Sequence, residues 1–115
     1  MTNHSSGHHA EQVAAEYLKA HDYTIVDINW KSRMAEIDIV AKNKGDALVF
    51  FEVKYRSSSW QGSGLDYITP AKFNQMQRAA NAWVQANGFR GEYSLGAVEV
   101  SGDEYTVTAV LDELL

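Results

Sequence analysis

Two strand-like runs joined by a short polar turn occupy residues 35–56, AEIDIVAKNKGDALVFFEVKYR, and constrain the fold more than any other stretch. The turn at residues 42–46 (KNKGD) separates two apolar-rich runs, so the stretch predicts a β-hairpin. Side chains alternate between the two faces of a strand. One face of the predicted hairpin is therefore almost wholly apolar, and we expect it to lie against a core: Ile37, Ile39, Ala41, Phe51, Val53 and Tyr55.

The opposite face of the hairpin is apolar near the turn, at Val40 and Phe50, and charged toward the open end. Its charged residues are Glu36, Asp38, Glu52, Lys54 and Arg56. Acidic residues are poor strand formers, and two interpretations explain them here. The first is the solvated face of a one-sided antiparallel sheet. The second is a metal site, where carboxylates of adjacent strands hold a hard cation beside an ammonium group. Alternation alone leaves both open.

The length and composition predict one domain over residues 1–115, since 45% of the residues are hydrophobic and one modest core can form. Cysteine is absent, which excludes disulfides and thiol catalysis. No apolar run approaches the about 18 residues of a membrane span, and the first ten residues lack the apolar region of a signal peptide. We therefore expect a soluble cytoplasmic protein without a membrane partner.

The net charge of −5 is unevenly distributed. Residues 29–90 contain nine bases and five acids and so carry +4, whereas the remainder contains one base and ten acids and carries −9. An acidic chain argues against the broad basic surface of many nucleic-acid-binding proteins. The locally basic span nevertheless permits phosphate binding, with limited non-specific affinity.

A helix and a strand are predicted before the hairpin. Apolar residues at i, i+3 and i+4 spacing predict a helix over residues 10–20, with residues 1–7 frayed before it. Glu11 lies on the margin of the apolar stripe, where an acid in the first turn is favoured by the helix dipole. Alternating residues at 23–30 predict a strand, so one helix precedes three consecutive strands.

A second helix and a second hairpin are predicted after it. Thr69 and Pro70 form a typical helix start and Gly88 a typical stop, and the residues between them predict a buried stripe of Phe73, Met76, Ala80, Trp83 and Val84. Strands at 93–100 and 105–111, joined by residues 101–104, complete the chain. A cation in the first helical turn opposes the helix dipole, so Lys72 indicates either phosphate contact or plain solvation, and Gln75 and Arg78 extend the same surface.

Asp38 followed by Glu52-Val53-Lys54 resembles the PD-(D/E)XK signature of the restriction-endonuclease-like superfamily. The strings HAEQVAAEYL, INWKSRMAEIDIVA, FFEVKYR and ITPAKFNQMQRAANAWV resemble, in this order, the YraN-like family of small bacterial proteins. The resemblance implies an α/β protein with a restriction-endonuclease-like three-layer fold. Its core has the order α-β-β-β-α-β, here with an extra C-terminal strand.

The resemblance also implies a divalent-metal-dependent nuclease that hydrolyses phosphodiester bonds, with DNA rather than RNA as substrate. Asp38, Glu52 and Glu11 would hold Mg²⁺ or Mn²⁺ together with the Val53 carbonyl oxygen. Lys54 would stabilise charge on the phosphate, and Glu36 would support a ligand. The implied nucleic-acid contacts are Arg56, Lys72, Gln75 and Arg78. Resemblance to Holliday-junction resolvases extends the expectation to branched DNA and a homodimer.

Two departures from the resembled family and one loop qualify these expectations. Members often carry Asp where this chain has Gly96, and Gly where it has Ala35. The polar loop at residues 57–68 leaves the strand of Glu52 and could close over the site, with Trp60 anchoring it or stacking on a base. The alternatives to a nuclease are a non-catalytic nucleic-acid-binding module of the same fold and a protein-interaction adaptor.

Overall fold

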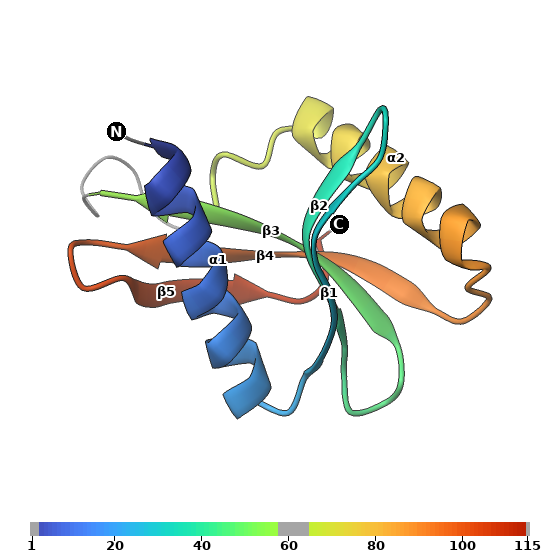
Figure 1. The fold of residues 1–115 in the computed structure, drawn as a ribbon, viewed down its shortest axis with the longest axis horizontal. Helices are drawn as coiled ribbons and strands as arrows, with labels where there is room; N and C mark the ends of the chain where they lie inside the picture. The colour runs from blue at the N-terminus through green and yellow to red at the C-terminus, as the bar shows by residue number, and fades with distance from the viewer. Residues whose placement is uncertain (1–2, 58–64, 115) are drawn as a thin grey trace.

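The computed structural model describes residues 3–57 and 65–114 (Figure 1). The elements in chain order are α1 (Asn3–Ala20), β1 (Thr24–Lys31), β2 (Glu36–Lys42), β3 (Leu48–Arg56), α2 (Pro70–Asn87), β4 (Tyr93–Ser101) and β5 (Thr106–Leu111). The predicted order α-β-β-β-α-β with an additional last strand is confirmed. The predicted loop at residues 57–68 falls largely outside the described residues, Trp60 included.

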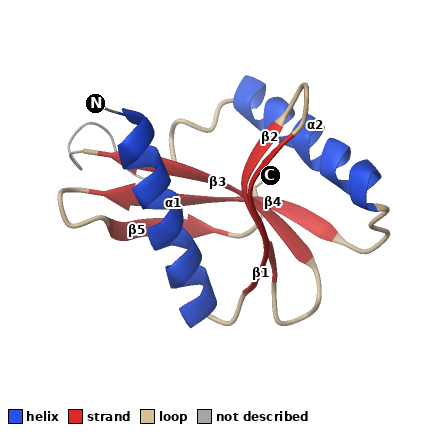
Figure 2. Cartoon of the chain, in the orientation of Figure 1, coloured by secondary structure: helices blue, strands red, loops and turns tan. Residues whose placement is uncertain are grey.

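The five strands form one sheet in the order β1-β2-β3-β4-β5 (Figure 2). Neighbouring strands are antiparallel except β3 and β4, which are parallel. A parallel pair needs a long crossover connection, and α2 lies within that connection. The two predicted hairpins, β2–β3 and β4–β5, are therefore joined into one mixed sheet.

Helix α1 covers one face of the sheet. Its apolar stripe of Ala10, Ala14, Ala15 and Leu18 packs on alternate residues of the central strands, among them Ile39, Ala41, Val49, Phe51, Val98 and Val100. The prediction that the helix begins at Ala10 after a frayed segment is wrong, because α1 begins at Asn3. Beside the added turns lies a tertiary contact that periodicity does not reveal: the His9 and Tyr105 rings pack nearly perpendicular to each other, with their centroids 4.3 Å apart.

Helix α2 covers the opposite face, so the sheet lies between two helical layers. Its buried residues pack on Val40, Leu48, Phe50 and Leu95. The predicted start and stop are confirmed: the Lys72 N–H donates to the Thr69 hydroxyl at 3.1 Å, and Gly88 adopts φ 62°. Because both faces near the turn are covered, Val40 and Phe50 are buried rather than part of an open face.

Strand β2 pairs with β3 over only part of its length. The pairing runs from Lys42–Leu48 to Ile39–Phe51 and then stops, while β2 stays paired with β1 as far as Glu36. The first residues of β2, 36–38, therefore depart from β3 and approach α2. The prediction that Ile37 shares a core with Ile39 is wrong, since Ile37 packs in the cluster beneath α2.

Gly96 lies in β4 opposite Phe51 of β3. A Cβ atom at this position would stand 2.6 Å from the carbonyl oxygen of Leu111 and 2.8 Å from the Phe51 ring, closer than non-bonded carbon atoms approach. The space that an Asp side chain would need is thus filled by an aromatic ring. Among the described residues no helix is long and apolar enough to cross a membrane.

Candidate functional site

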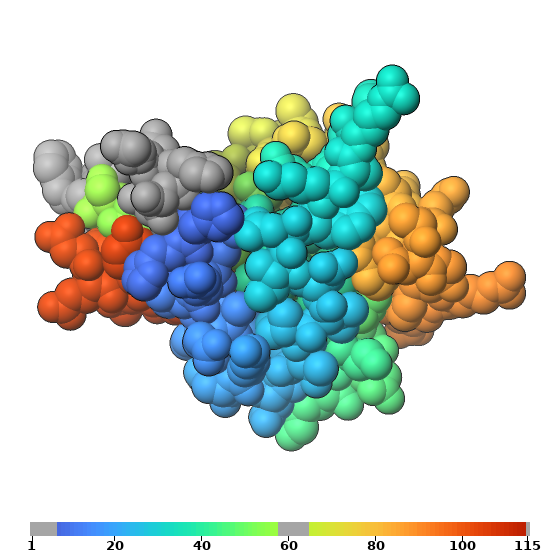
Figure 3. Space-filling model, in the orientation of Figure 1, coloured from blue at the N-terminus to red at the C-terminus, as the bar shows by residue number. Residues whose placement is uncertain are grey.

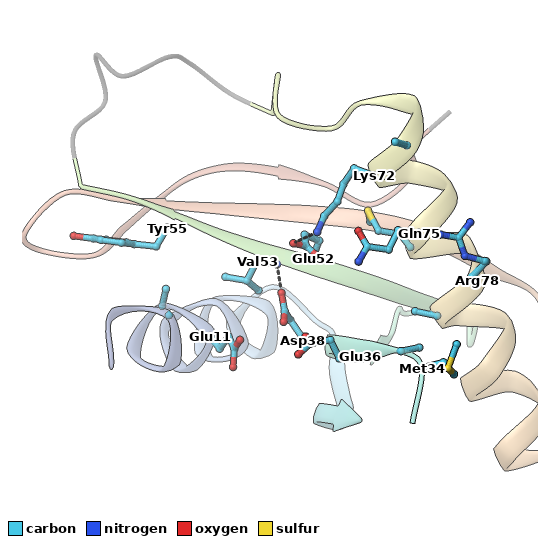
Figure 4. Close-up of a pocket in the computed structure, with 16 residues that line it drawn as sticks. Glu11, Met34, Glu36, Asp38, Glu52, Val53, Tyr55, Lys72, Gln75 and Arg78 are labelled. Atoms are coloured by element: carbon cyan, nitrogen blue, oxygen red, sulfur yellow. Dashed lines mark hydrogen bonds and ion pairs between the residues drawn. The ribbon is translucent and has the colours of Figure 1, made fainter. Parts of the chain in front are cut away.

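A cavity of about 590 Å³ opens where β2 departs from β3, between the beginnings of α1 and α2 (Figure 4). It brings together residues that the sequence separates by up to 72 positions, from Gly7 of α1 to Ala79 of α2. Most of the residues predicted to form a site line it: Glu11, Glu36, Asp38, Glu52, Val53, Lys72, Gln75 and Arg78.

Asp38 lies at the centre of this arrangement. The pairing of β2 with β3 ends at Ile39. Beyond that point the Asp38 side chain, instead of the β2 backbone, accepts the backbone N–H of Val53 in β3, at 2.7 Å (Figure 4). Burial and the negative charges of Glu52 and Glu11 together raise the pKa of the Asp38 carboxyl to about 8, although the hydrogen bond from the Val53 N–H lowers it. Asp38 is therefore mostly protonated at neutral pH, and no basic side chain of residues 3–57 or 65–114 forms an ion pair with it.

Glu52 has such a cation. The Lys72 Nζ atom lies 2.9 Å from the Glu52 Oε2 atom, and both side chains are about three-quarters buried. Lys72 is in the first turn of α2, where its backbone N–H is held by the Thr69 cap. The cap thus fixes the helix turn from which the ammonium group reaches β3.

Glu11 completes the acidic side of the cavity from α1. Its Oε1 atom is buried and has no hydrogen-bond partner in the described part of the chain. A buried carboxylate oxygen without a donor costs free energy unless it is protonated or meets a cation. Of the other three acids that line the cavity, Glu36 is exposed, whereas Asp38 and Glu11 are partly buried and have no ion-pair partner among the described residues.

Lys54 and Arg56 do not line the cavity. Lys54 is exposed, with its Nζ atom 5.7 Å from the centre of the Tyr67 ring. The Arg56 guanidinium donates to Glu99 at 2.6 Å and to Asp66 at 2.9 Å. The predicted contributions of Lys54 to catalysis and of Arg56 to nucleic-acid binding thus stay predictions, and the ammonium that reaches the cavity belongs to Lys72.

The residues of the cavity have the donor chemistry of a hard cation site. Their free donors are carboxylate and backbone carbonyl oxygens, which Mg²⁺ and Mn²⁺ prefer, and the unpartnered oxygen of Glu11 is a vacant donor. Within residues 3–57 and 65–114, however, no three His, Cys, Asp or Glu side chains are grouped closely enough to hold an ion together. Joint binding therefore requires side-chain movement, with the departure of Glu52 from Lys72 as the obvious first change.

Two residues beside the cavity were not singled out in the sequence. Met34 lines the cavity from the turn between β1 and β2. Tyr67 has a buried hydroxyl without a hydrogen-bond partner among the described residues, and burial with the nearby charges of Glu52 and Asp38 raises its pKa. Neither position follows a periodic pattern, so only the packing of the hairpin and of the segment before α2 reveals them.

The fold and the cavity define a mixed α/β protein, with a five-stranded sheet between two helices and an acidic cavity rimmed by basic residues. Residues 10–103 match the family model described as "Uncharacterised protein family UPF0102". The chain belongs to this family, as the resemblance to YraN-like proteins predicted.

Individual members of the family match over most of their length. A UPF0102 protein of Leifsonia xyli subsp. xyli is 40% identical over 82 residues, which are 71% of this chain and 69% of the relative. A UPF0102 protein of Aliivibrio salmonicida is 36% identical over 88 residues, which are 76% of this chain and 71% of the relative. A UPF0102 protein of Christiangramia forsetii is 36% identical over 86 residues.

Proposed function

We propose that this protein is a divalent-metal-dependent nuclease of the PD-(D/E)XK type, which hydrolyses phosphodiester bonds in DNA. The observation that carries the proposal is the grouping of carboxyl groups, two of them without an ion-pair partner among the described residues, at the point where β2 and β3 separate. Asp38 and Glu11 lack a cation, and the pKa of Asp38 is raised to about 8. Sites whose ionisable groups are strongly perturbed by burial and by neighbouring charge are often functional.

The position of each acid supports the assignment. Asp38 and Glu52 come from adjacent strands and Glu11 comes from the first helix, in a chain with the order α-β-β-β-α-β. The carbonyl oxygen of Val53 is a further donor, since its N–H already holds Asp38 in place. Mg²⁺ or Mn²⁺, when bound by these oxygens, would screen the phosphate charge and acidify a nearby water molecule.

Lys72 is the residue best placed to contact the substrate phosphate. In the absence of a cation, its ammonium group neutralises Glu52 at 2.9 Å. Once a bound divalent cation neutralises Glu52, the Lys72 ammonium group can bind the substrate phosphate instead. There it would stabilise the negative charge that develops on the phosphate oxygens. Gln75 and Arg78, one and two turns further along α2, line the same cavity and can hold the neighbouring phosphates of the strand.

A nuclease assay with Mn²⁺ on single-stranded, duplex, nicked and four-way-junction DNA tests this function. We expect cleavage by the unaltered chain, none in EDTA, and a loss of at least about 100-fold for Asp38→Asn. Glu16→Gln is the matched control, because Glu16 is an exposed acid of α1 that pairs with Lys19 away from the cavity. Cleavage that survives in Asp38→Asn, or that falls equally in Glu16→Gln, would contradict the proposal.

A non-catalytic nucleic-acid-binding module is the second candidate, and two observations favour it. No three acidic side chains among the described residues are grouped closely enough to hold an ion, and Glu52 already forms an ion pair with Lys72. In such a module Lys72, Gln75 and Arg78 would bind phosphates while the carboxylates played no part. DNA binding without any cleavage in Mn²⁺ would favour this candidate over the nuclease.

A further inference from the structure

The turn between β1 and β2 is an arm that projects beside the cavity. Figure 3 shows it in teal, standing out from the surrounding surface. β1 and β2 stay paired up to Lys31 and Glu36, whereas the pairing of β2 with β3 ends at Ile39. The arm is therefore a two-stranded ribbon that extends beyond the rest of the sheet.

The arm is held by a hydrogen bond at its tip and by apolar packing below the tip. The Ser32 N–H donates to the Ala35 carbonyl oxygen at 2.8 Å and closes the turn, which leaves Arg33 and Met34 at its apex. At the base, Trp30, Ala35 and Ile37 pack in the cluster beneath α2. A side chain on such a support is presented without a large loss of conformational freedom on binding.

Met34 at this apex is 89% exposed, the most exposed large hydrophobic residue in the described part of the chain. An isolated apolar side chain on a surface needs no explanation by itself. The surroundings of Met34 distinguish it: it lines the acidic cavity and also a second hollow of about 300 Å³ at the base of the tip. The charged residues of this second hollow are two bases, Lys31 and Arg33, and one acid, Glu36. The apolar tip thus stands between the candidate catalytic cavity and a basic hollow.

The bases around the tip are available to an anion. No ion pair joins Lys31, Arg33 or Arg78 to a carboxylate of residues 3–57 or 65–114. Lys31 and Arg33 flank the turn on the arm, and Arg78 lies across the cavity on α2. An apolar tip between unpaired bases complements a polyanion whose backbone is charged and whose interior is apolar.

We propose that Met34 is a wedge that inserts beside a base where the stacking of DNA is interrupted inside a duplex, at a branch point or nick. Lys31, Arg33 and Arg78 hold the phosphates on either side. Methionine is among the apolar residues that proteins insert between base steps, and a break in stacking lowers the cost of insertion. The inference rests on the proposed function, because it takes DNA as the ligand and gives the substrate class of the same cavity.

Binding measurements without cleavage test the wedge. The unaltered chain is titrated in EDTA against a four-way junction and a linear duplex of equal length, each carrying 2-aminopurine, at the branch point or at the matching position. We expect tighter binding to the junction and a rise in 2-aminopurine fluorescence as the base unstacks. Met34→Ser should weaken junction binding about tenfold and abolish the fluorescence rise, with duplex affinity unchanged. Met34→Phe should preserve both signals.

Ile28→Ser is the matched control, since Ile28 is an exposed apolar residue of β1 (42%) that lines neither hollow. It should bind the junction like the unaltered chain. Lys31→Gln and Arg33→Gln should each weaken binding to all DNA forms alike and reduce the slope of log K against log salt by about 1.

The inference is overturned if Met34→Ser matches the unaltered chain on the junction, if Ile28→Ser loses as much, or if the unaltered chain binds neither DNA. Failure of the wedge and failure of the proposed function give different results. Cleavage in Mn²⁺ that is indifferent to Met34 removes the wedge and leaves the nuclease. A fluorescence rise that depends on Met34, without cleavage in Mn²⁺, supports the wedge and removes the nuclease.

Discussion

The Lys72 Nζ atom lies 2.9 Å from the Glu52 Oε2 atom, and this ion pair joins the first turn of α2 to the third strand of the sheet. The pair neutralises one of the four carboxyls that line the cavity from α1, β2 and β3. Asp38 and Glu11 keep their need for positive charge. A divalent cation would therefore compete with Lys72 for Glu52, which makes the behaviour of Lys72 a test of the site.

Replacement of Lys72 by Ala should make the metal-free protein less stable by about 1–2 kcal/mol at pH 8, because Glu52 and Asp38 then repel each other without a cation. Mn²⁺ should raise the melting temperature of Lys72→Ala more than that of the unaltered chain, since the competing ammonium is gone. Cleavage should fall. Chemical denaturation, thermal melts with Mn²⁺ and single-turnover cleavage measure the three effects.

Lys54→Ala is the control for this experiment. Because Lys54 is exposed and does not line the cavity, its loss should cost less than about 1 kcal/mol and leave cleavage nearly unchanged. If Lys54→Ala abolished cleavage while Lys72→Ala did not, the role that the sequence motif gives to Lys54 would be correct and the assignment to Lys72 wrong.

The raised pKa of Asp38 predicts how stability depends on pH. Its carboxyl has a pKa of about 8 in the fold against 3.8 for an unperturbed aspartate, so the folded state binds the proton more tightly than the unfolded chain. The associated stability is fully present below about pH 4 and is lost as the pH rises through 8. Asp38→Asn removes this loss and should be more stable than the unaltered chain by roughly 1–3 kcal/mol at pH 9, with little difference near pH 4.

Urea denaturation of the two proteins at pH 4, 7 and 9 measures this difference. Glu36→Gln is the control, because Glu36 is an exposed acid of the same strand. Its free energy of unfolding should follow that of the unaltered chain at each pH. If the difference in unfolding free energy between Asp38→Asn and the unaltered chain stayed constant from pH 4 to 9, the pKa of Asp38 would not be raised in the folded state.

The packing of Gly96 predicts that even the smallest side chain is harmful there. Gly96→Ala should destabilise the protein by about 1–3 kcal/mol, because the new methyl group meets the Leu111 carbonyl oxygen and the Phe51 ring. Gly45→Ala should cost little, since a Cβ at Gly45 lies no closer than 3.5 Å to any other group. Equal melting temperatures for the two variants would show that β4 can shift to make room.

The element order could be read from the sequence because its signals are local. The Thr69 cap, Pro70 and the glycine at position 88 fix α2 to within one residue, and the alternation of residues 35–56 gives the hairpin. The start of α1 could not be read in this way, because residues 3–9 (NHSSGHH) contain no apolar side chain that would mark a helical period. The ring contact of His9 there is with Tyr105, which is far away in the chain.

The membership of the site could be predicted only in part. Asp38, Glu52 and Glu11, which the resemblance implied as metal ligands, all line the cavity, and their role as ligands stays a prediction. Alternation placed Lys54 on the same face of β3 as Glu52. The cavity, however, opens where the first residues of β2 leave β3, and the ammonium group that reaches it is that of Lys72 in α2. Ile37 packs beneath α2 instead of beside Ile39, and Met34 is exposed, because β2 separates from β3. No residue pattern in either strand encodes this separation.

The central claim is that the acidic cavity binds a divalent cation, and titration calorimetry with Mn²⁺ tests it most directly. We predict saturable binding to the unaltered chain and to the Glu16→Gln control, and binding at least about tenfold weaker for Asp38→Asn and Glu52→Gln. No heat of binding to the unaltered chain, or identical isotherms for the unaltered chain and Asp38→Asn, would contradict the account.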